Sequence, residues 1–212
     1  MITKEQVLSH PKVIDALAML AKYSGETICE DTLIDIFNEA DYQWNTGCTR
    51  FVILDDDWDF VLKIAIYSYQ NEDANLTEFN NYKKAEEFGV EKVLLPTLPL
   101  VDLGLKNGLI YYQPKFSTSI SDFRWSETEE AEEFSNRYLQ LSHSDFIENL
   151  QDKFCDGNRL DPLWLACVFS LFGEEFCEKL ALWSKKNGVN DLHNSNTGLL
   201  NGKPVIIDYA GF

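Results

Sequence analysis

Residues 191–209 read DLHNSNTGLLNGKPVIIDY, and this stretch decides how the C-terminal part of the chain folds. The pair Asn201-Gly202 stands between two short apolar runs. An Asn-Gly pair in that setting is the strongest short signal for a β-hairpin, because both residues accept positive φ angles. We therefore predict a loop that starts at Asp191, followed by a small hairpin with Asp208 directly after its second strand.

The polar side chains of this stretch suit a hard cation and a proton transfer. The loop and the hairpin would deliver Asp191, Asn196 and Asp208 to one place. Mg²⁺ prefers oxygen ligands and keeps several waters. Asn196 and Asp208 can supply two such oxygens while nucleotide phosphates supply others. Asp191 can accept a proton from a substrate hydroxyl.

The segment before the loop predicts a central helix. Asp161 is a good N-cap, Pro162 suits the first helical position, and Gly188 follows the last periodic residue. Apolar residues line one side throughout and nearly all sides of the first half. We predict one helix over 161–187, with Gly173 as a point of bending. An acidic helix over 122–141, with a solvated face, precedes it.

The N-terminal half predicts helices followed by a small sheet. Two apolar runs joined by the polar turn 55–59 indicate a pair of strands. The order is helices, then about four strands with one inserted helix, then helices and the terminal hairpin, so the fold class is α+β. The expected helices cover about 11–24, 31–40 and 72–88, and the expected strands 51–54, 60–67, 92–101 and 108–113.

Composition excludes several classes of protein. The 212 residues are 45% apolar, which is enough for a substantial core. The chain has 18 Lys and Arg residues and 35 Asp and Glu residues, which gives a net charge of −17. This charge disfavours binding to nucleic acid and to anionic lipid, because both are negatively charged. No apolar run is long enough for a membrane span, and the first residues lack the pattern of a signal peptide. Five scattered cysteines form no zinc motif, so we expect a reduced, cytoplasmic protein.

The pattern Asp191-x-x-x-x-Asn196, then a hairpin, then Asp208-Tyr209 resembles the catalytic loop and metal-binding Asp of protein-kinase-like phosphotransferases. The variant Asp-Leu-His is most similar to small bacteriophage serine/threonine kinases and to aminoglycoside- and choline-kinase-like enzymes. The resemblance implies a truncated two-lobe kinase-like fold. Residues 1–40 would be a helical extension, 41–114 the sheet lobe, and 115–212 a reduced helical lobe ending just after Asp208. A phage origin would place the protein in the host cytoplasm.

The same resemblance assigns roles earlier in the chain. Residues 45–52, NTGCTRFV, stand where the phosphate-covering loop is expected. They keep the middle glycine, Gly47, while Arg50 replaces an outer glycine and can place a charge near the phosphates. Lys63, in the strand FVLKI, would hold the α- and β-phosphates.

Three further assignments follow from the family pattern. A glutamate of the next helix would pair with Lys63. Glu78 is the first choice, and Glu72 and Glu86 are the alternatives. Gln113, in the strand that leads to the hinge, would lie at the adenine site. His193 is expected to organise the loop, because Asp191 already fills the role of base.

The resemblance implies an ATP- and Mg²⁺-dependent phosphotransferase that transfers the γ-phosphate to a hydroxyl. A serine/threonine protein kinase of reduced size is favoured over a small-molecule kinase, because the sequence holds no helices beyond Asp208 to build a small-molecule pocket. The substrate would then bind by an unusual surface, or a protein partner or a second copy in a homodimer would complete the acceptor site.

Two alternatives belong to other classes. The sequence holds only four residues beyond Asp208, and the glycine loop is degenerate. These departures favour a catalytically inactive kinase-like module (pseudokinase) that binds a partner protein. The net charge alone would also fit an acidic inhibitor of a basic protein.

Overall fold

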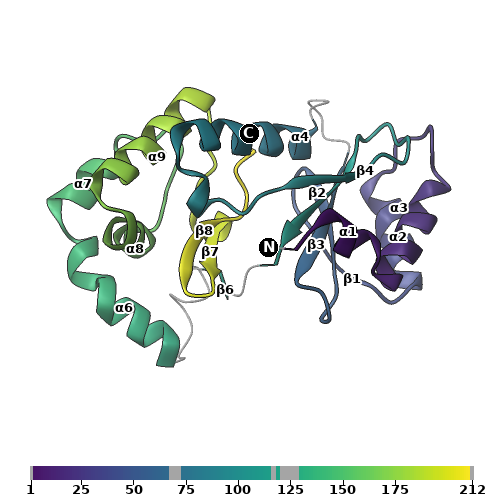
Figure 1. Cartoon of the computed structure of the whole chain (residues 1–212), viewed down its shortest axis with the longest axis horizontal. Coiled ribbons are helices and arrows are strands. Elements are labelled where there is room, and N and C mark those ends of the chain that lie inside the picture. Colours follow the sequence, from purple (N-terminus) through teal and green to yellow (C-terminus); the bar gives the residue numbers. More distant parts are fainter. Residues whose placement is uncertain (1, 67–72, 116–117, 120–128, 211–212) are drawn as a thin grey trace. The chain divides into compact units, whose positions relative to one another are not determined.

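The computed structural model describes residues 2–66, 73–115, 118–119 and 129–210 (Figure 1). The chain is α+β, and its contacts divide it into two units. We call Met1–Phe79 with Pro96–Lys115 the sheet unit, and Asn80–Leu95 with Phe116–Phe212 the helical unit. Within the described residues, no helix has the length and apolar character needed to cross a membrane.

The sheet unit contains a five-stranded antiparallel sheet in the order β1-β2-β3-β5-β4. The two expected strands around the turn 55–59 are confirmed, and an additional strand precedes them. That strand alternates between exposed and half-buried residues, so no apolar run marks it in the sequence. The strands are β1 (Gln43–Thr46), β2 (Arg50–Leu54), β3 (Phe60–Ala65), β4 (Leu98–Val101) and β5 (Ile110–Pro114).

The strand expected over 92–101 is wrong in its first half. A short 3-10 helix, η1 (Glu91–Val93), occupies its start, and β4 begins only at Leu98. Pro96 lies between the two. The first half of the apolar run pairs elsewhere, because the Leu95 N–H donates to the Ile206 carbonyl at 2.9 Å.

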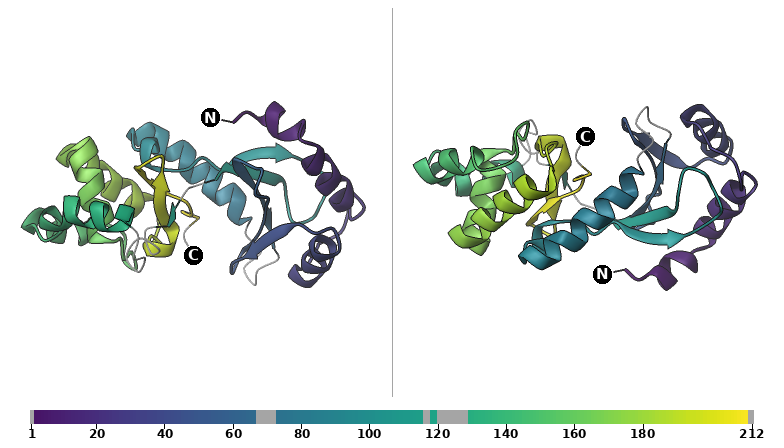
Figure 2. Two further views of the ribbon diagram at one scale, coloured as in Figure 1. Left: turned by 90° about the horizontal axis from the view of Figure 1, so that it is seen from below. Right: turned by 90° about the horizontal axis from the view of Figure 1, so that it is seen from above.

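The two faces of the sheet have different partners. One face packs against α1 (Lys4–Leu8), α2 (Pro11–Ala21) and α3 (Glu30–Glu39), as Figure 2 shows. Leu62 and Ile64 of β3 share a buried core with Leu20 and Phe37 of these helices. Residues 1–40 therefore contribute to the core of the sheet instead of building one of their own. Side chains alternate along a strand, so Lys63 lies on the other face.

The helical unit surrounds a small sheet. Its described helices are the second part of α4 (Ala74–Phe88), η1, α6 (Glu129–Ser142), α7 (Asp145–Gln151), α8 (Pro162–Phe172), α9 (Glu174–Asn187) and the short η2 (Asn194–Asn196). The strands β6 (Thr118–Ser119), β7 (Thr197–Leu200) and β8 (Lys203–Ile206) pair in sequence order. The acidic helix begins, within the described residues, at Glu129, and its expected start at Asp122 lies outside them.

The single helix expected over 161–187 is wrong, because it is two helices. Gly173 has φ of +80° and ψ of 178°, which ends α8 and begins α9. The apolar side continues across this break, so periodicity alone does not reveal it. The expected ends are confirmed. Asp161 caps the N–H of Leu163 at 2.7 Å, and Gly188 is left-handed with φ of +66°.

The hairpin predicted at Asn201-Gly202 is confirmed. Both turn residues have positive φ, 52° and 72°, and Leu200 pairs with Lys203 across the turn. This is the backbone of a type I′ turn, whose twist matches that of the strands it joins. Asp208 follows β8 directly, as expected.

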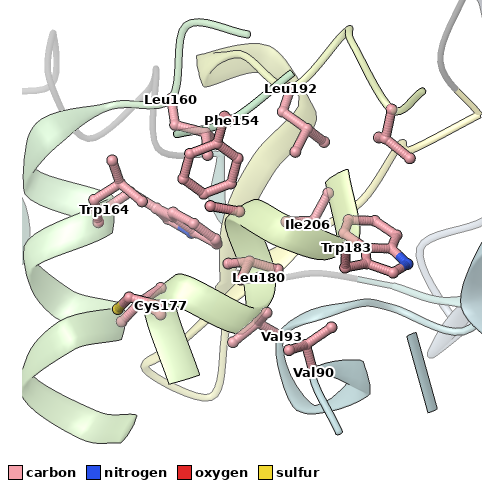
Figure 3. Close-up of a cluster of buried hydrophobic side chains, with 14 of the residues drawn as sticks. Val90, Val93, Phe154, Leu160, Trp164, Cys177, Leu180, Trp183, Leu192 and Ile206 are labelled. Atoms are coloured by element: carbon pink, nitrogen blue, oxygen red, sulfur yellow. The ribbon is translucent and has the colours of Figure 1, made fainter. Parts of the chain in front are cut away.

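A large hydrophobic core lies inside the helical unit (Figure 3). Trp164 of α8, Leu180 and Trp183 of α9, and Ile206 of β8 are all buried in it. Val90 and Val93, which follow α4, belong to the same core. Residues 80–95 therefore group with the helices and not with the sheet.

Candidate functional site

The sheet unit buries an ion pair between β3 and α4. Lys63 Nζ lies 3.0 Å from Oε2 and 3.3 Å from Oε1 of Glu78. The two side chains are 6% and 0% exposed. Such burial is unusual for Lys and Glu unless they are paired, and each of these two side chains provides the partner that the burial of the other requires.

The structure describes one of the other two candidate partners of Lys63. Glu86 is exposed and pairs with Lys83 at 2.9 Å, within its own helix. Glu72 lies outside the described residues. Among the candidates that the structure describes, Glu78 is the glutamate that contacts Lys63.

A second cation reaches the same carboxylate. The guanidinium of Arg50, at the start of β2, contacts Oε2 of Glu78, and the Arg50 side chain is 7% exposed. Arg50 pairs in register with Ala65, and Val52 with Lys63, so both cations belong to one face of the sheet. Two buried positive side chains thus share one buried carboxylate.

The polar contacts continue to Gln113 through a residue that the sequence reasoning missed. Lys63 Nζ lies 3.4 Å from Thr97 Oγ1, and Gln113 Nε2 donates to the same hydroxyl at 3.1 Å. Thr97 is fully buried and Gln113 is 3% exposed. Thr97 is the one polar residue in the run LLPTLPL, residues 94–100. A single polar residue inside an apolar run indicates a buried side chain that needs a hydrogen-bond partner. We call Arg50, Glu78, Lys63, Thr97 and Gln113 the buried polar chain.

Tyr111 lies beside this chain as a neutral group. It pairs in register with Lys63 across β3 and β5, and it is 1% exposed. Burial, with a smaller effect of the Asp73 charge, raises the pKa of Tyr111 to about 12. Its hydroxyl therefore adds no negative charge near Lys63 at physiological pH.

Gly47 lies in the turn between β1 and β2. Its N–H donates to the Arg50 carbonyl at 2.9 Å, which closes the turn tightly. A Cβ at this position would meet nothing within 4 Å, and φ is not in the left-handed region. The turn itself therefore does not require glycine.

In the helical unit, the loop that carries Asp191 is fixed through its backbone. Leu192 points into the core, as Figure 3 shows. Asn158 accepts from the Leu192 N–H at 2.7 Å and donates to the Val189 carbonyl at 2.8 Å. The Arg159 N–H donates to the Leu192 carbonyl at 2.7 Å. The backbone is therefore held firmly while the Asp191 side chain stays 54% exposed.

His193 contacts residues on both sides of it in the loop. Its Nδ1 accepts from the Ser195 N–H at 3.2 Å, and its Nε2 lies 3.5 Å from Asp191 Oδ1. The Asn196 amide nitrogen lies 3.2 Å from the same Nε2. These contacts organise the loop around the Asp191 carboxylate.

Asn196 and Asp208 are brought close through the backbone. The Ile207 N–H donates to the Asn196 carbonyl at 2.8 Å, directly before Asp208. The Asn196 amide nitrogen donates to the Asp191 carbonyl at 2.7 Å, so its amide oxygen points the other way.

An amide oxygen and a carboxylate suit a hard cation such as Mg²⁺. No group of three or more His, Cys, Asp and Glu side chains that could hold a metal occurs among the residues the structure describes.

The backbone after Asp208 is held by a residue that the sequence reasoning did not single out. Asn81, 3% exposed on α4, donates to the carbonyls of Tyr209 at 2.9 Å and Ala210 at 3.3 Å. The Tyr209 hydroxyl donates to the Leu95 carbonyl at 2.6 Å. Asn81 follows Glu78 by three residues on the same helix, and only its burial distinguishes it from the exposed Asn80.

The chain was also compared with known proteins. No protein-family model matches it, and no curated protein matches it at a significant level of similarity.

Proposed function

We propose that the protein is an ATP- and Mg²⁺-dependent phosphotransferase, a serine/threonine protein kinase of reduced size that acts on a protein hydroxyl. The buried ion pair between Lys63 and Glu78 carries the proposal. A lysine on the third strand, held by a glutamate of the following helix, is the arrangement that positions nucleotide phosphates in protein-kinase-like enzymes.

The loop of the helical unit gives the second support. Asp191 is exposed on a loop whose backbone is fixed, which suits a group that must meet a substrate hydroxyl. Asn196 and Asp208 stand at neighbouring backbone positions and offer oxygen ligands. The order of these parts along the chain, with Lys63 first and Asp208 last, is the order of the family pattern.

Each residue then has one task. Lys63, oriented by Glu78, binds the α- and β-phosphates of ATP. Asp191 orients the acceptor hydroxyl and takes its proton as the oxygen bonds to the γ-phosphorus and the bond to the β–γ bridging oxygen breaks. Asn196 and Asp208 would hold Mg²⁺, which supplies charge neutralisation for the phosphates when bound. Positioning and charge provide most of the catalysis.

A second candidate function is a catalytically inactive kinase-like module that binds a partner protein. The contact between Arg50 and Glu78 favours this inactive module, because Lys63 shares the Glu78 carboxylate with a second cation. The side chains Asp191, Asn196 and Asp208 favour the active form, since a binding module has no need of this set together.

The test is transfer of radiolabelled γ-phosphate from Mg·ATP to the protein itself and to proteins of a bacterial lysate. We expect label on serine or threonine with the wild type. Asp191→Asn and Asp208→Ala should each reduce labelling by about 10²-fold or more, because each removes a group that acts in the transfer.

Asp156→Asn is the matched control, since Asp156 is also an exposed aspartate of the helical unit. It should label like the wild type. Nucleotide binding without label in any reaction would favour the inactive module, and the absence of nucleotide binding would overturn both candidate functions.

A further inference from the structure

The two cysteines of the sheet unit are both exposed, and they lie in segments that contact each other. Cys29 directly precedes α3, and Cys48 lies in the turn between β1 and β2. The residue after Cys29 is Glu30, whose Oε1 accepts from the Thr46 hydroxyl at 2.7 Å. Thr46 is the last residue of β1. This hydrogen bond therefore joins the start of α3 to the end of β1, next to both thiols.

A second contact shows that α3 and β1 run side by side in opposite directions. Trp44 Nε1 donates to Asn38 Oδ1 at 2.8 Å, near the end of α3. From Asn38 back to Cys29, a helix covers about 13 Å at about 1.5 Å per residue. From Trp44 to Cys48, an extended chain covers at most about 13 Å at about 3.3 Å per residue. The two contacts therefore place Cys29 and Cys48 at the same end of this pair of elements.

The turn that carries Cys48 is anchored on both sides of this residue. The Gly47 N–H donates to the Arg50 carbonyl at 2.9 Å, and the Ile66 N–H donates to the Thr49 carbonyl at 3.0 Å. A disulfide needs its two Cα atoms about 5–6 Å apart. Because a Cβ at Gly47 would meet nothing within 4 Å, the turn has room to close the remaining distance to α3.

Cys29 is placed to react first. Its Sγ lies 3.2 Å from the hydroxyl of Thr32, in the first turn of α3. That hydroxyl lowers the pKa of the Cys29 thiol. The start of a helix also favours a negatively charged sulfur. The thiolate is the form that attacks peroxides, and an exposed thiolate next to a second cysteine is typical of redox-sensing sites.

We propose that Cys29 and Cys48 form a reversible disulfide when the protein meets a peroxide, and that this bond ties the turn between β1 and β2 to α3. The Cys29 sulfur attacks one peroxide oxygen, the O–O bond breaks, and the other oxygen leaves as water. The sulfenic acid on Cys29 then reacts with the Cys48 thiol, the S–S bond forms, and the second oxygen leaves as water. Two thiols are thus oxidised and hydrogen peroxide is reduced to two waters. A thiol reductant reverses the bond.

The test treats the full chain with hydrogen peroxide, blocks the remaining thiols, and digests the protein without reduction for mass spectrometry. We expect the five free thiols to fall to three, with a linked peptide pair that contains Cys29 and Cys48. Dithiothreitol should restore both thiols. The same treatment in urea should give much less of this pair, because folding is what brings the two segments together.

Serine variants assign the two roles. Cys29→Ser and Cys48→Ser should each abolish the linked pair, and both positions are exposed, so neither change should disturb folding. In Cys48→Ser, Cys29 should stay a sulfenic acid that dimedone labels, because the second thiol is missing. Cys155→Ser is the matched control. It removes a half-buried cysteine of the helical unit and should form the linked pair like the wild type.

The outcomes separate this proposal from the proposed function, on which it does not depend. An unreacted Cys29, a wild-type Cys29 that stays a sulfenic acid, or disulfides that join two chains would each overturn the inference. A linked pair in a protein that transfers no phosphate would support the inference while the kinase function failed. Phosphate transfer by a protein that forms no linked pair would do the reverse.

Discussion

The two groups of candidate residues are built in opposite ways. In the sheet unit, the buried polar chain consists of side chains that hold one another, with Glu78 fully buried. In the helical unit, the loop at Asp191 is held by backbone contacts and by Leu192, while the Asp191 carboxylate is exposed. In the first arrangement, the candidate residues also support the fold, because their charges cannot be removed singly without a cost in stability. In the second arrangement, the exposed candidate side chains contribute little to stability.

The largest effect should come from Glu78→Gln. It leaves Arg50 and Lys63 buried without the shared carboxylate, and breaking a buried pair in this way costs about 3–5 kcal/mol. Urea unfolding at neutral pH would measure the loss. Glu86→Gln, which breaks an exposed pair on the same helix, should cost less than about 0.5 kcal/mol. Similar losses in the two variants would contradict the comparison.

Asn81→Ala should have the next largest effect. It removes the donor to the Tyr209 and Ala210 carbonyls, and leaving such buried groups unpaired costs about 1–3 kcal/mol. Asn80→Ala, on the exposed side of the same helix, is the control. Thermal unfolding should give a clearly lower midpoint for the first variant alone. An unchanged midpoint would mean that the backbone after Asp208 does not depend on Asn81.

Gly202→Ala should cost about 1 kcal/mol, because alanine is strained at a φ of +72°. Gly47→Ala provides the contrast. Its φ is not left-handed and its Cβ position is open, so the free energy of unfolding should stay the same or rise by up to about 1 kcal/mol. Urea unfolding of the two variants distinguishes a turn that needs glycine for its backbone from one that does not.

Asp191→Asn should have the smallest effect on folding, within about 0.5 kcal/mol of the wild type. The same variant should abolish most phosphate transfer if the proposed function holds. A clear loss of stability, measured by urea unfolding, would show that the exposed carboxylate contributes to the fold and would remove the contrast with Glu78.

Local sequence signals determined the turns and the helix ends. Asn201-Gly202 and Asp161-Pro162 act through their own backbone preferences and through neighbours a few residues away. They could therefore be read without knowledge of the rest of the chain. The helix break at Gly173 is not predictable from the sequence, because a glycine can bend a helix or end it, and the apolar side continues past it.

Only the tertiary structure decided which groups of the candidate site meet. Glu78 and Glu86 lie on one helix, about two turns apart, and nothing in their sequence surroundings tells which one reaches Lys63. The packing of the first turns of α4 on the sheet buries one and leaves the other in water. The sequence does not predict these contacts because the residues that make them are separated along the chain. Arg50, Lys63, Glu78 and Thr97 come from distant parts of the chain, and their contacts depend on burial and strand register, which no local pattern encodes.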